Sequence, residues 1–188
     1  GTTTTTDDAD GEVVRTRPIP EITGTTIEAA LATLRGRIVQ TPPAYSAIKQ
    51  GGVPLYKRAR RGEDVQVPSR EVDVDRFDLQ GRVGDVLNLH VECGSGTYER
   101  SLARDLGERL GCGAQLTALR RLWVEPFRDP CMHALDELER IAADGGTAAL
   151  DRLLLPIEAG LDALPALHLD ADQARRLRHG QRLNLPGQ

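Results

Sequence analysis

Aromatic residues and cysteines are scarce in this chain. Aromatic side chains make up 3% of the 188 residues, so leucine, valine, isoleucine and alanine must supply the core. No apolar run approaches the roughly 18 residues of a membrane-spanning helix, and no charged-then-apolar leader opens the sequence, so neither a membrane span nor a secretory signal is expected. The cysteines, Cys93, Cys112 and Cys131, are odd in number and lack C-x-x-C spacing, which favours reduced thiols and a cytoplasmic protein.

Candidate metal ligands are sparse as well. The four histidines are scattered along the sequence at His90, His133, His168 and His179. They lack the spacing with which histidines and cysteines bind a metal ion. A metal-dependent enzyme is therefore not expected.

The charge is distributed unevenly along the chain. The net charge of −4 by itself argues against a nucleic-acid-binding protein. Screening, however, confines a charge interaction to about 8 Å at physiological salt, so a local basic segment is enough to contact phosphates. Such a segment, 35–62, has no acidic residue and seven basic ones: Arg35, Arg37, Lys49, Lys57, Arg58, Arg60 and Arg61. The alternative interpretation is a solvated, basic helix face.

A strand, a glycine turn and a helix follow one another near the middle of the chain. Alternating apolar residues predict a strand over 85–93, the glycines of 94–97 predict a turn, and a helix is expected over 97–110. Tyr98 and Arg100 leave this turn. An arginine beside an aromatic ring at such a junction suits a site that holds a carboxylate or phosphate against a flat ring. The alternative is a structural turn whose arginine is solvated.

Local patterns predict the other elements. The polar stretch 1–11 is typical of a loop, and a capping box at Thr25–Glu28 predicts a helix that ends at Gly36. Further strands are expected over 12–16, 70–79, 115–124 and 182–185, and further helices over 55–61, 133–143, 148–155 and 170–180. A strand so near the last residue leads us to expect a small second domain that is cut off or disordered.

Several motifs occur together in one order. They are Leu34-Arg35-Gly36, Gln40-Thr41-Pro42-Pro43-Ala44-Tyr45-Ser46-Ala47-Ile48-Lys49, Leu55-Tyr56 with Ala59-Arg60, Gly96-Thr97-Tyr98 with Arg100, Asp105-Leu106-Gly107, Leu110-Gly111, and Leu116 with Leu119-Arg120-Arg121. In this order and spacing the chain resembles the bacterial TruB-type tRNA pseudouridine synthases. The resemblance implies an α+β fold in which 1–163 is the C-terminal portion of the catalytic domain, with a mixed, mainly antiparallel sheet and flanking helices. Residues 164–188 would begin a small, truncated PUA-like RNA-binding domain.

The resemblance also implies an activity. Such enzymes are isomerases that convert uridine 55 in the T-loop of tRNA to pseudouridine, without a metal or a cofactor. The base is flipped out of its stack, the glycosidic bond breaks, the uracil turns and a carbon–carbon bond forms. The family's catalytic aspartate lies in a motif that this sequence does not contain. We therefore expect the chain alone to be inactive and the missing N-terminal half of the catalytic domain to complete the sheet.

The same resemblance assigns roles to matching residues. Arg100 would pair with the absent catalytic carboxylate, and Tyr98 would pack beneath the flipped uracil or form a hydrogen bond with it. The backbone of Leu119 would hold the uracil edge, and Asp8 would tie Arg100 or the loop beneath it. Segment 41–62 would be an insertion that clamps the T-loop, with phosphate contacts from Lys49, Lys57, Arg58, Arg60 and Arg61.

Two other classes of protein stay open at this point. A non-catalytic RNA-binding or RNA-chaperone module would need only the basic segment 35–62. A purely structural interaction domain would need neither that segment nor Arg100. Substitutions at Arg100 and in the basic segment distinguish these classes, because they separate turnover from RNA binding.

Overall fold

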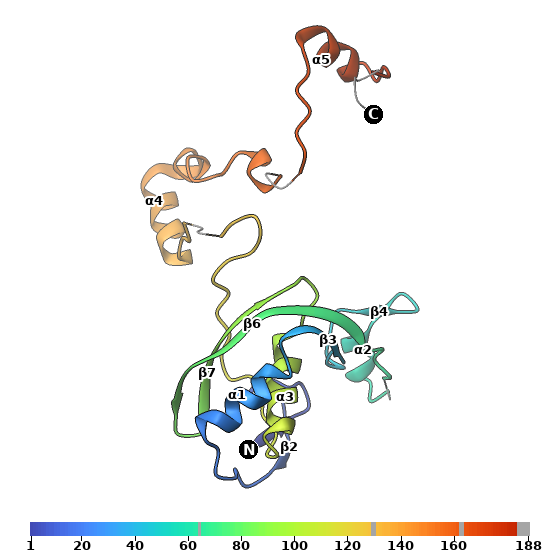
Figure 1. The fold of residues 1–188 in the computed structure, drawn as a ribbon. Helices are drawn as coiled ribbons and strands as arrows, with labels where there is room; N and C mark the ends of the chain where they lie inside the picture. The colour runs from blue at the N-terminus through green and yellow to red at the C-terminus, as the bar shows by residue number, and fades with distance from the viewer. Residues whose placement is uncertain (64, 129–130, 162–163, 184–188) are drawn as a thin grey trace. The chain divides into compact units, whose positions relative to one another are not determined.

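The computed structural model describes residues 1–63, 65–128, 131–161 and 164–183 (Figure 1). Two units can be distinguished, Gly1–Leu119 and Arg120–Gln188. The elements are helices and antiparallel strands, in agreement with the predicted α+β class. Among the described residues, none of the helices combines the length and the apolar character that crossing a bilayer requires.

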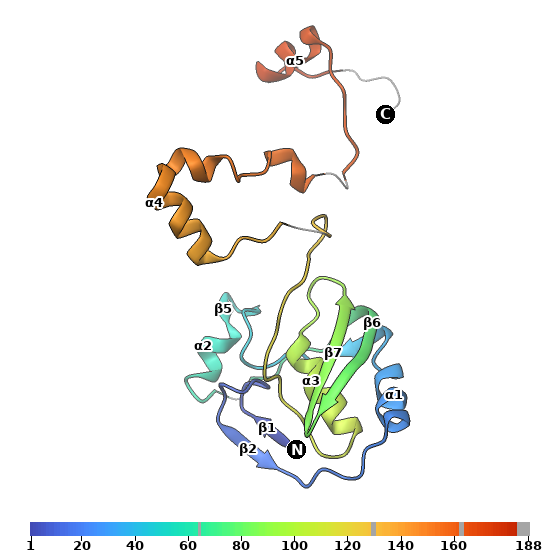
Figure 2. The ribbon, with the colours of Figure 1, turned by 90° about the vertical axis from the view of Figure 1, so that its left-hand side faces the viewer.

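A three-stranded antiparallel sheet forms the centre of the first unit (Figure 2). Its order is β3, β6, β7, and these strands span Gly36–Gln40, Arg70–Val83 and Val86–Cys93. The strands predicted over 70–79 and 85–93 are confirmed as β6 and β7, and β6 continues to Val83 instead of ending at Leu79. Strand β3 was not predicted: Gly36, expected to end a helix, begins a strand with φ of +78°.

The long strand β6 buries alternate side chains until its register changes. Val72 and Val74 are buried on one face, as the alternating pattern predicted. The pairing with β7 then shifts between Val74 and Arg76. One extra residue in a strand reverses which side chains face the core, so Phe77 is buried and Arg76 is exposed.

Two helices pack against the buried face of the sheet. They are α1 (Gly24–Ala32) and α3 (Glu99–Arg109). The core consists of Ile27, Ala30, Leu31, Leu34, Val72, Val74, Phe77, Leu102, Leu106, Leu110 and Cys112. The predicted capping box of α1 was wrong, because Thr23 is the N-cap and its Oγ1 accepts a hydrogen bond from the backbone N–H of Thr26 at 3.2 Å.

Two small hairpins complete the first unit. Strands β1 (Thr2–Thr4) and β2 (Val13–Thr16) pair with each other, so part of the stretch expected to be a loop is a strand. Strands β4 (Lys49–Gln50) and β5 (Val53–Pro54) form the second hairpin and lead into helix α2 (Leu55–Ala59). The helix predicted over 55–61 is thus confirmed, although it ends two residues earlier.

The described residues of the second unit form helices joined by irregular segments. Helix α4 (Leu135–Asp151) consists of two helical parts that meet at a kink at Gly146, whose φ of +62° and ψ of −162° are not helical. The two helices predicted over 133–143 and 148–155 are thus confirmed, with shifted ends. A 3-10 helix, η1 (Ile157–Gly160), and α5 (Ala171–Arg178) follow. Asp170 caps α5 through a capping box, and the helix predicted over 170–180 is confirmed, although it is slightly shorter. The strand predicted over 182–185 lies largely outside the described residues.

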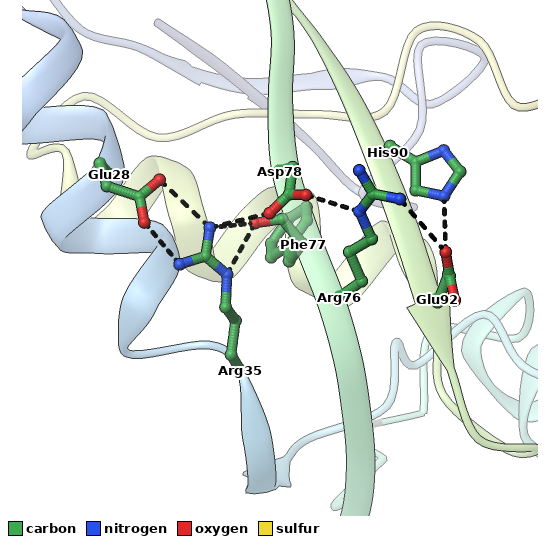
Figure 3. Close-up of polar contacts among 7 residues, drawn as sticks. All are labelled: Glu28, Arg35, Arg76, Phe77, Asp78, His90 and Glu92. Atoms are coloured by element: carbon green, nitrogen blue, oxygen red, sulfur yellow. Dashed lines mark hydrogen bonds and ion pairs between the residues drawn. The ribbon is translucent and has the colours of Figure 1, made fainter.

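Polar side chains link α1 to the sheet through Arg35 (Figure 3). Its Nη1 donates to Glu28 Oε1 at 2.5 Å, and its Nη2 donates to Phe77 O at 2.7 Å and to Asp78 Oδ1 at 3.1 Å. Arg76 Nε donates to the other oxygen of Asp78 at 2.6 Å. Arg35 therefore holds the end of α1 against β6, and its guanidinium is fully engaged within the fold.

The ion pairs continue across the sheet to β7. Glu92 Oε1 lies 3.5 Å from Arg76 Nη1 and 3.1 Å from His90 Nε2. The hydrogen bond from Arg35 lowers the pKa of Glu28, and the one from Arg76 lowers the pKa of Asp78. A carboxyl group whose pKa is lowered by folding stabilises the fold above its ordinary pKa and loses that effect as the pH falls.

We expect the substitution Arg35→Met in the full-length protein to cost stability mainly at neutral pH. The difference in unfolding free energy between parent and variant should shrink as the pH falls below the ordinary pKa values of 4.5 for Glu28 and 3.8 for Asp78, toward the lower pKa values of these groups in the fold. The reason is that protonated carboxyls no longer pair with Arg35. Urea unfolding between neutral and acidic pH measures this. A difference that is constant with pH would contradict the role of the ion pairs.

Candidate functional site

The turn between β7 and α3 presents Tyr98 and Arg100 at the predicted place. Gly94 donates its backbone N–H to a carbonyl of β6 at 2.8 Å and accepts a hydrogen bond from Thr97 Oγ1 at 2.8 Å. Gly96 has φ of +86°, a conformation that residues with a side chain rarely adopt. The chain then enters α3, so both side chains stand at the start of a helix that the core holds in place.

Arg100 lies between two loops. Its Nη1 donates to Thr6 O and its Nη2 to Tyr45 O, both at 3.3 Å. The side chain is half-buried, so the interpretation of a merely solvated arginine does not hold. Both acceptors are neutral carbonyls, which leaves the positive charge of the guanidinium in place for an anion. Tyr45 belongs to the 41–62 segment, so this segment borders the site.

Gln40 fixes the backbone of Tyr98. Its side chain is fully buried, with 0% relative exposure. Its Oε1 accepts the Tyr98 N–H at 2.8 Å, and its Nε2 donates to Tyr98 O at 3.2 Å. Next to it, Ser101 Oγ donates to Thr41 O at 3.0 Å. The end of β3 and the start of α3 are therefore joined by three side-chain hydrogen bonds.

Asp7 and Arg104 form an ion pair beside this junction. Arg104 Nη1 lies 2.9 Å from Asp7 Oδ2, while its Nη2 donates to Thr41 O at 2.8 Å and its Nε donates to Asp105 Oδ1 at 2.9 Å. Asp7 has φ of +59°, a left-handed conformation that aspartate tolerates better than most residues. This conformation turns the loop so that the Asp7 carboxylate faces α3.

Burial raises the pKa of the Asp7 carboxyl above its ordinary value. The charge and the hydrogen bond of Arg104 and, more weakly, the charge of Arg100 act in the opposite direction, but burial is the larger effect. The negative charge of Asp105 adds to the rise. The ionised form of Asp7 therefore depends on Arg104.

Asp8 and Leu119 lie on paired segments. Ala9 N–H donates to Leu116 O at 2.8 Å, and Leu116 N–H donates to Asp7 O at 3.0 Å, which makes a parallel bridge at Asp8. The Asp8 carboxylate accepts the N–H of Asp10 at 3.4 Å, within its own loop. Leu119 follows this bridge and is 57% exposed.

The prediction of a strand over 115–124 was wrong. Its pairing in the first unit is confined to Leu116, and Val124 forms only an isolated bridge with Phe127. An extended segment becomes a strand when a neighbouring backbone pairs with it along its length. Because this segment runs from the first unit into the second, that neighbour is lost after Leu116.

The basic 41–62 segment is a braced hairpin and helix. Leu55 is fully buried and donates its N–H to Ile48 O at 2.7 Å. Arg58 is half-buried, and its guanidinium donates to Glu63 Oε2 and to Gln50 Oε1, each at 2.6 Å. Arg58 therefore holds the segment together from within.

The exposed cations available in the basic segment 35–62 form a smaller set than the sequence indicated. The side chain of Arg35 is engaged with Glu28 and Asp78, and Arg37 lies 3.2 Å from Asp73 Oδ1. Arg60 is exposed and lies over the ring of Tyr56, 5.6 Å from its centroid. We call the exposed cations of 41–62 the basic rim; it comprises Lys49, Lys57, Arg60 and Arg61, of which Arg61 lies 3.9 Å from Glu63 Oε1.

Sequence reasoning missed Asp7, Gln40, Arg70 and Arg104. Gln40 lies in one of the motifs that carried the family resemblance, but its partner is 58 residues away, and Arg104 lies 97 residues from Asp7. No local pattern marks contacts at such distances. Over the described ranges, no group of three or more His, Cys, Asp or Glu residues is arranged to hold a metal ion.

We expect Arg104→Met in the full-length protein to raise the pKa of Asp7 further. The substitution removes the charge and the hydrogen bond that lower this pKa, while burial, which raises it, remains. When folding raises the pKa of an acid, the protein loses the stability that this acid contributes as the pH rises through the folded-state pKa. Carbon-13 NMR titration of the Asp7 carboxyl measures the shift. Arg109→Met, on the same helix, is the control, and an unchanged pKa in Arg104→Met would contradict the assignment.

Two family models match adjoining parts of the chain, which together cover residues 1–162. The model described as TruB family pseudouridylate synthase (N terminal domain) matches residues 1–99. The model described as tRNA pseudouridylate synthase B C-terminal domain matches residues 100–162. The junction between the two falls next to Tyr98 and Arg100.

Three relatives illustrate the similarity, and each is named tRNA pseudouridine synthase B. The chain is 55% identical over 183 residues to the protein of Xanthomonas axonopodis pv. citri (strain 306), covering 97% of the chain and 59% of the relative. The corresponding values for Xylella fastidiosa (strain Temecula1 / ATCC 700964) are 54% over 183 residues, 97% and 60%. For Stutzerimonas stutzeri (strain A1501) they are 45% over 186 residues, 99% and 61%.

The chain thus spans about three fifths of the length of these relatives. The first family model alone covers residues 1–99 of 188, more than half of the sequence. The chain belongs to the TruB family of pseudouridylate synthases.

Proposed function

We propose that the full-length protein carrying this chain is a tRNA pseudouridine synthase that isomerises uridine 55 in the T-loop of tRNA. Membership of the TruB family and the names of the relatives support the activity. The observation that carries the proposal is Arg100, a half-buried arginine at the start of α3 whose guanidinium bonds only neutral carbonyls in the hydrogen bonds described above. A cation held in this way is ready to orient a carboxylate.

Arg100 is proposed to hold the catalytic aspartate, which residues outside this chain would supply. A guanidinium beside a carboxylate lowers its pKa and keeps it ionised. An ionised, oriented carboxylate can act as the nucleophile or base while the glycosidic bond of uridine breaks. The uracil then turns, a bond forms between C5 and the ribose carbon, and the proton of C5 is released to water.

The neighbouring residues are proposed to bind the flipped base. Tyr98 would contact the uracil, since Gln40 fixes its backbone next to Arg100. The exposed Leu119 would hold the uracil edge through its backbone, and Asp8 would shape the loop next to it. These assignments account for a base-binding site built from the turn, the loop and the segment after Leu116.

The basic rim is proposed to contact phosphates of the T-stem-loop. Its side chains are exposed and lie on the hairpin and helix that border Arg100 through Tyr45. Arg58, which the resemblance placed among the phosphate contacts, is proposed to brace this surface as well, because its guanidinium links Gln50 of the hairpin to Glu63 after the helix.

The proposal extends to the organisation of the whole protein. Residues 1–163 would form the C-terminal portion of the catalytic domain, with 41–62 as the clamping insertion, and 164–188 would begin a PUA-like RNA-binding domain. An N-terminal half would complete the sheet and bring the catalytic aspartate. The reaction would take place in the cytoplasm, without a metal or a cofactor.

We expect Arg100→Ala in the full-length protein to lower the single-turnover rate by about two to three orders of magnitude. The reason is that the catalytic carboxylate would lose the charge that orients it. Binding of the RNA should change little, because Arg100 is not in the basic rim. Release of tritium from C5 of uridine in a T-stem-loop RNA measures turnover. A rate close to that of the parent would overturn the proposal.

Lys57→Gln is the matched control for binding. It should weaken RNA binding and reduce the salt dependence of the affinity by about one unit of slope if one phosphate contact is lost. Its single-turnover rate at saturating enzyme should stay near that of the parent. If the parent binds RNA but releases no tritium, the protein is instead a non-catalytic RNA-binding or RNA-chaperone module, for which the basic rim suffices.

A further inference from the structure

Arg70 touches the ring of Tyr98 from the neighbouring strand. Its guanidinium carbon lies 5.0 Å from the centroid of the Tyr98 ring, within the range of a cation–π contact. Its Nη2 also donates to the carbonyl of Gly96, two residues before Tyr98. One side chain therefore contacts both the turn and the aromatic ring that the turn presents.

Arg70 and Gln40 act on Tyr98 from paired positions. The two residues are register partners on β6 and β3, and side chains at paired positions project from the same face of a sheet. Gln40 holds the backbone of Tyr98, and Arg70 covers its ring. Thr41 follows Gln40 and Ser69 precedes Arg70. The hydroxyls of these two neighbours lie 2.7 Å apart, so the two segments are also linked next to the Gln40–Arg70 pair.

The Arg70 guanidinium lies over the Tyr98 ring and contacts the Gly96 carbonyl, while its Nε is buried and has no hydrogen-bond partner among the described residues. A planar, delocalised guanidinium suits a contact with an aromatic ring better than the compact ammonium group of lysine does.

We propose that Arg70 is a positioning residue that holds the Tyr98 ring in the orientation needed to contact uracil. The inference rests on the proposed function and adds a residue to which neither the sequence nor the family comparisons gave a role. A guanidinium on one face of the ring leaves the edge, the hydroxyl and the opposite face for the base. It also prevents the ring from rotating into the space above the Gly96 turn, since Arg70 occupies that side.

The test compares Arg70→Met and Arg70→Lys with Arg76→Met in the full-length protein. Arg76 is an exposed arginine on the same strand and is paired with Asp78, away from Tyr98. Three quantities are measured: the single-turnover rate on a T-stem-loop RNA, the Kd for that RNA, and the fluorine-19 resonance of 3-fluorotyrosine incorporated at position 98. Thermal unfolding of each variant reports whether it is folded.

Arg70→Met should lower the single-turnover rate by about tenfold to a hundredfold, the cost of a misplaced contact group, with the Kd nearly unchanged. The fluorine resonance should move in this variant and stay in place in Arg76→Met. Arg70→Lys should restore only part of the rate, because an ammonium group lacks the flat surface. If Arg70→Met does not fold, the single-turnover rate and the fluorine resonance of Arg70→Lys decide instead.

Three outcomes would overturn the inference. They are a rate in Arg70→Met within the error of the parent, an unmoved fluorine resonance, and a loss confined to the Kd, which would make Arg70 a phosphate contact. A parent protein without turnover would instead refute the proposed function. In that case the fluorine resonance still tests whether Arg70 orients Tyr98, so the two failures can be told apart.

Discussion

The arrangement of the site depends on the two-way hydrogen bond between the Gln40 side chain and the backbone of Tyr98. A buried amide carries a donor and an acceptor at fixed separation, so it can pair with one residue of another segment as a neighbouring strand would. It joins β3 to the start of α3, which are 58 residues apart in sequence. The direction of α3, and with it the position of Arg100 between Thr6 and Tyr45, follows from this junction.

Charge distribution in the fold separates structural arginines from those available to RNA. Arg35 links α1 to β6, and Arg58 braces the hairpin and α2, so both serve the scaffold. The exposed basic rim lies on the segment whose Tyr45 carbonyl receives Arg100. The proposed phosphate contacts and the proposed catalytic residue Arg100 can therefore be altered independently, which is why substitutions are expected to separate RNA binding from turnover.

The sequence predicted those parts of the fold that local patterns determine. Alternating residues identified β6 and β7, and the glycines of 94–97 identified the turn before α3. The strand over 115–124 failed because its apolar residues resemble a strand while no neighbouring backbone pairs with them beyond Leu116. Asp7 and Arg70 could not be predicted, since their roles arise from partners far away along the chain. The catalytic role of Arg100 and the RNA contacts of the basic rim stay predictions.

The most direct test of the central claim is the stability of Gln40→Leu in the full-length protein, with the exposed Gln80→Leu on β6 as control. Tyr98 O keeps its helical bond from Leu102 N–H, so the loss is mainly the partner of the Tyr98 N–H. We predict a loss of about 1–3 kcal/mol in unfolding free energy and faster hydrogen exchange at the Tyr98 amide. Unchanged stability and unchanged exchange at that amide would contradict the account.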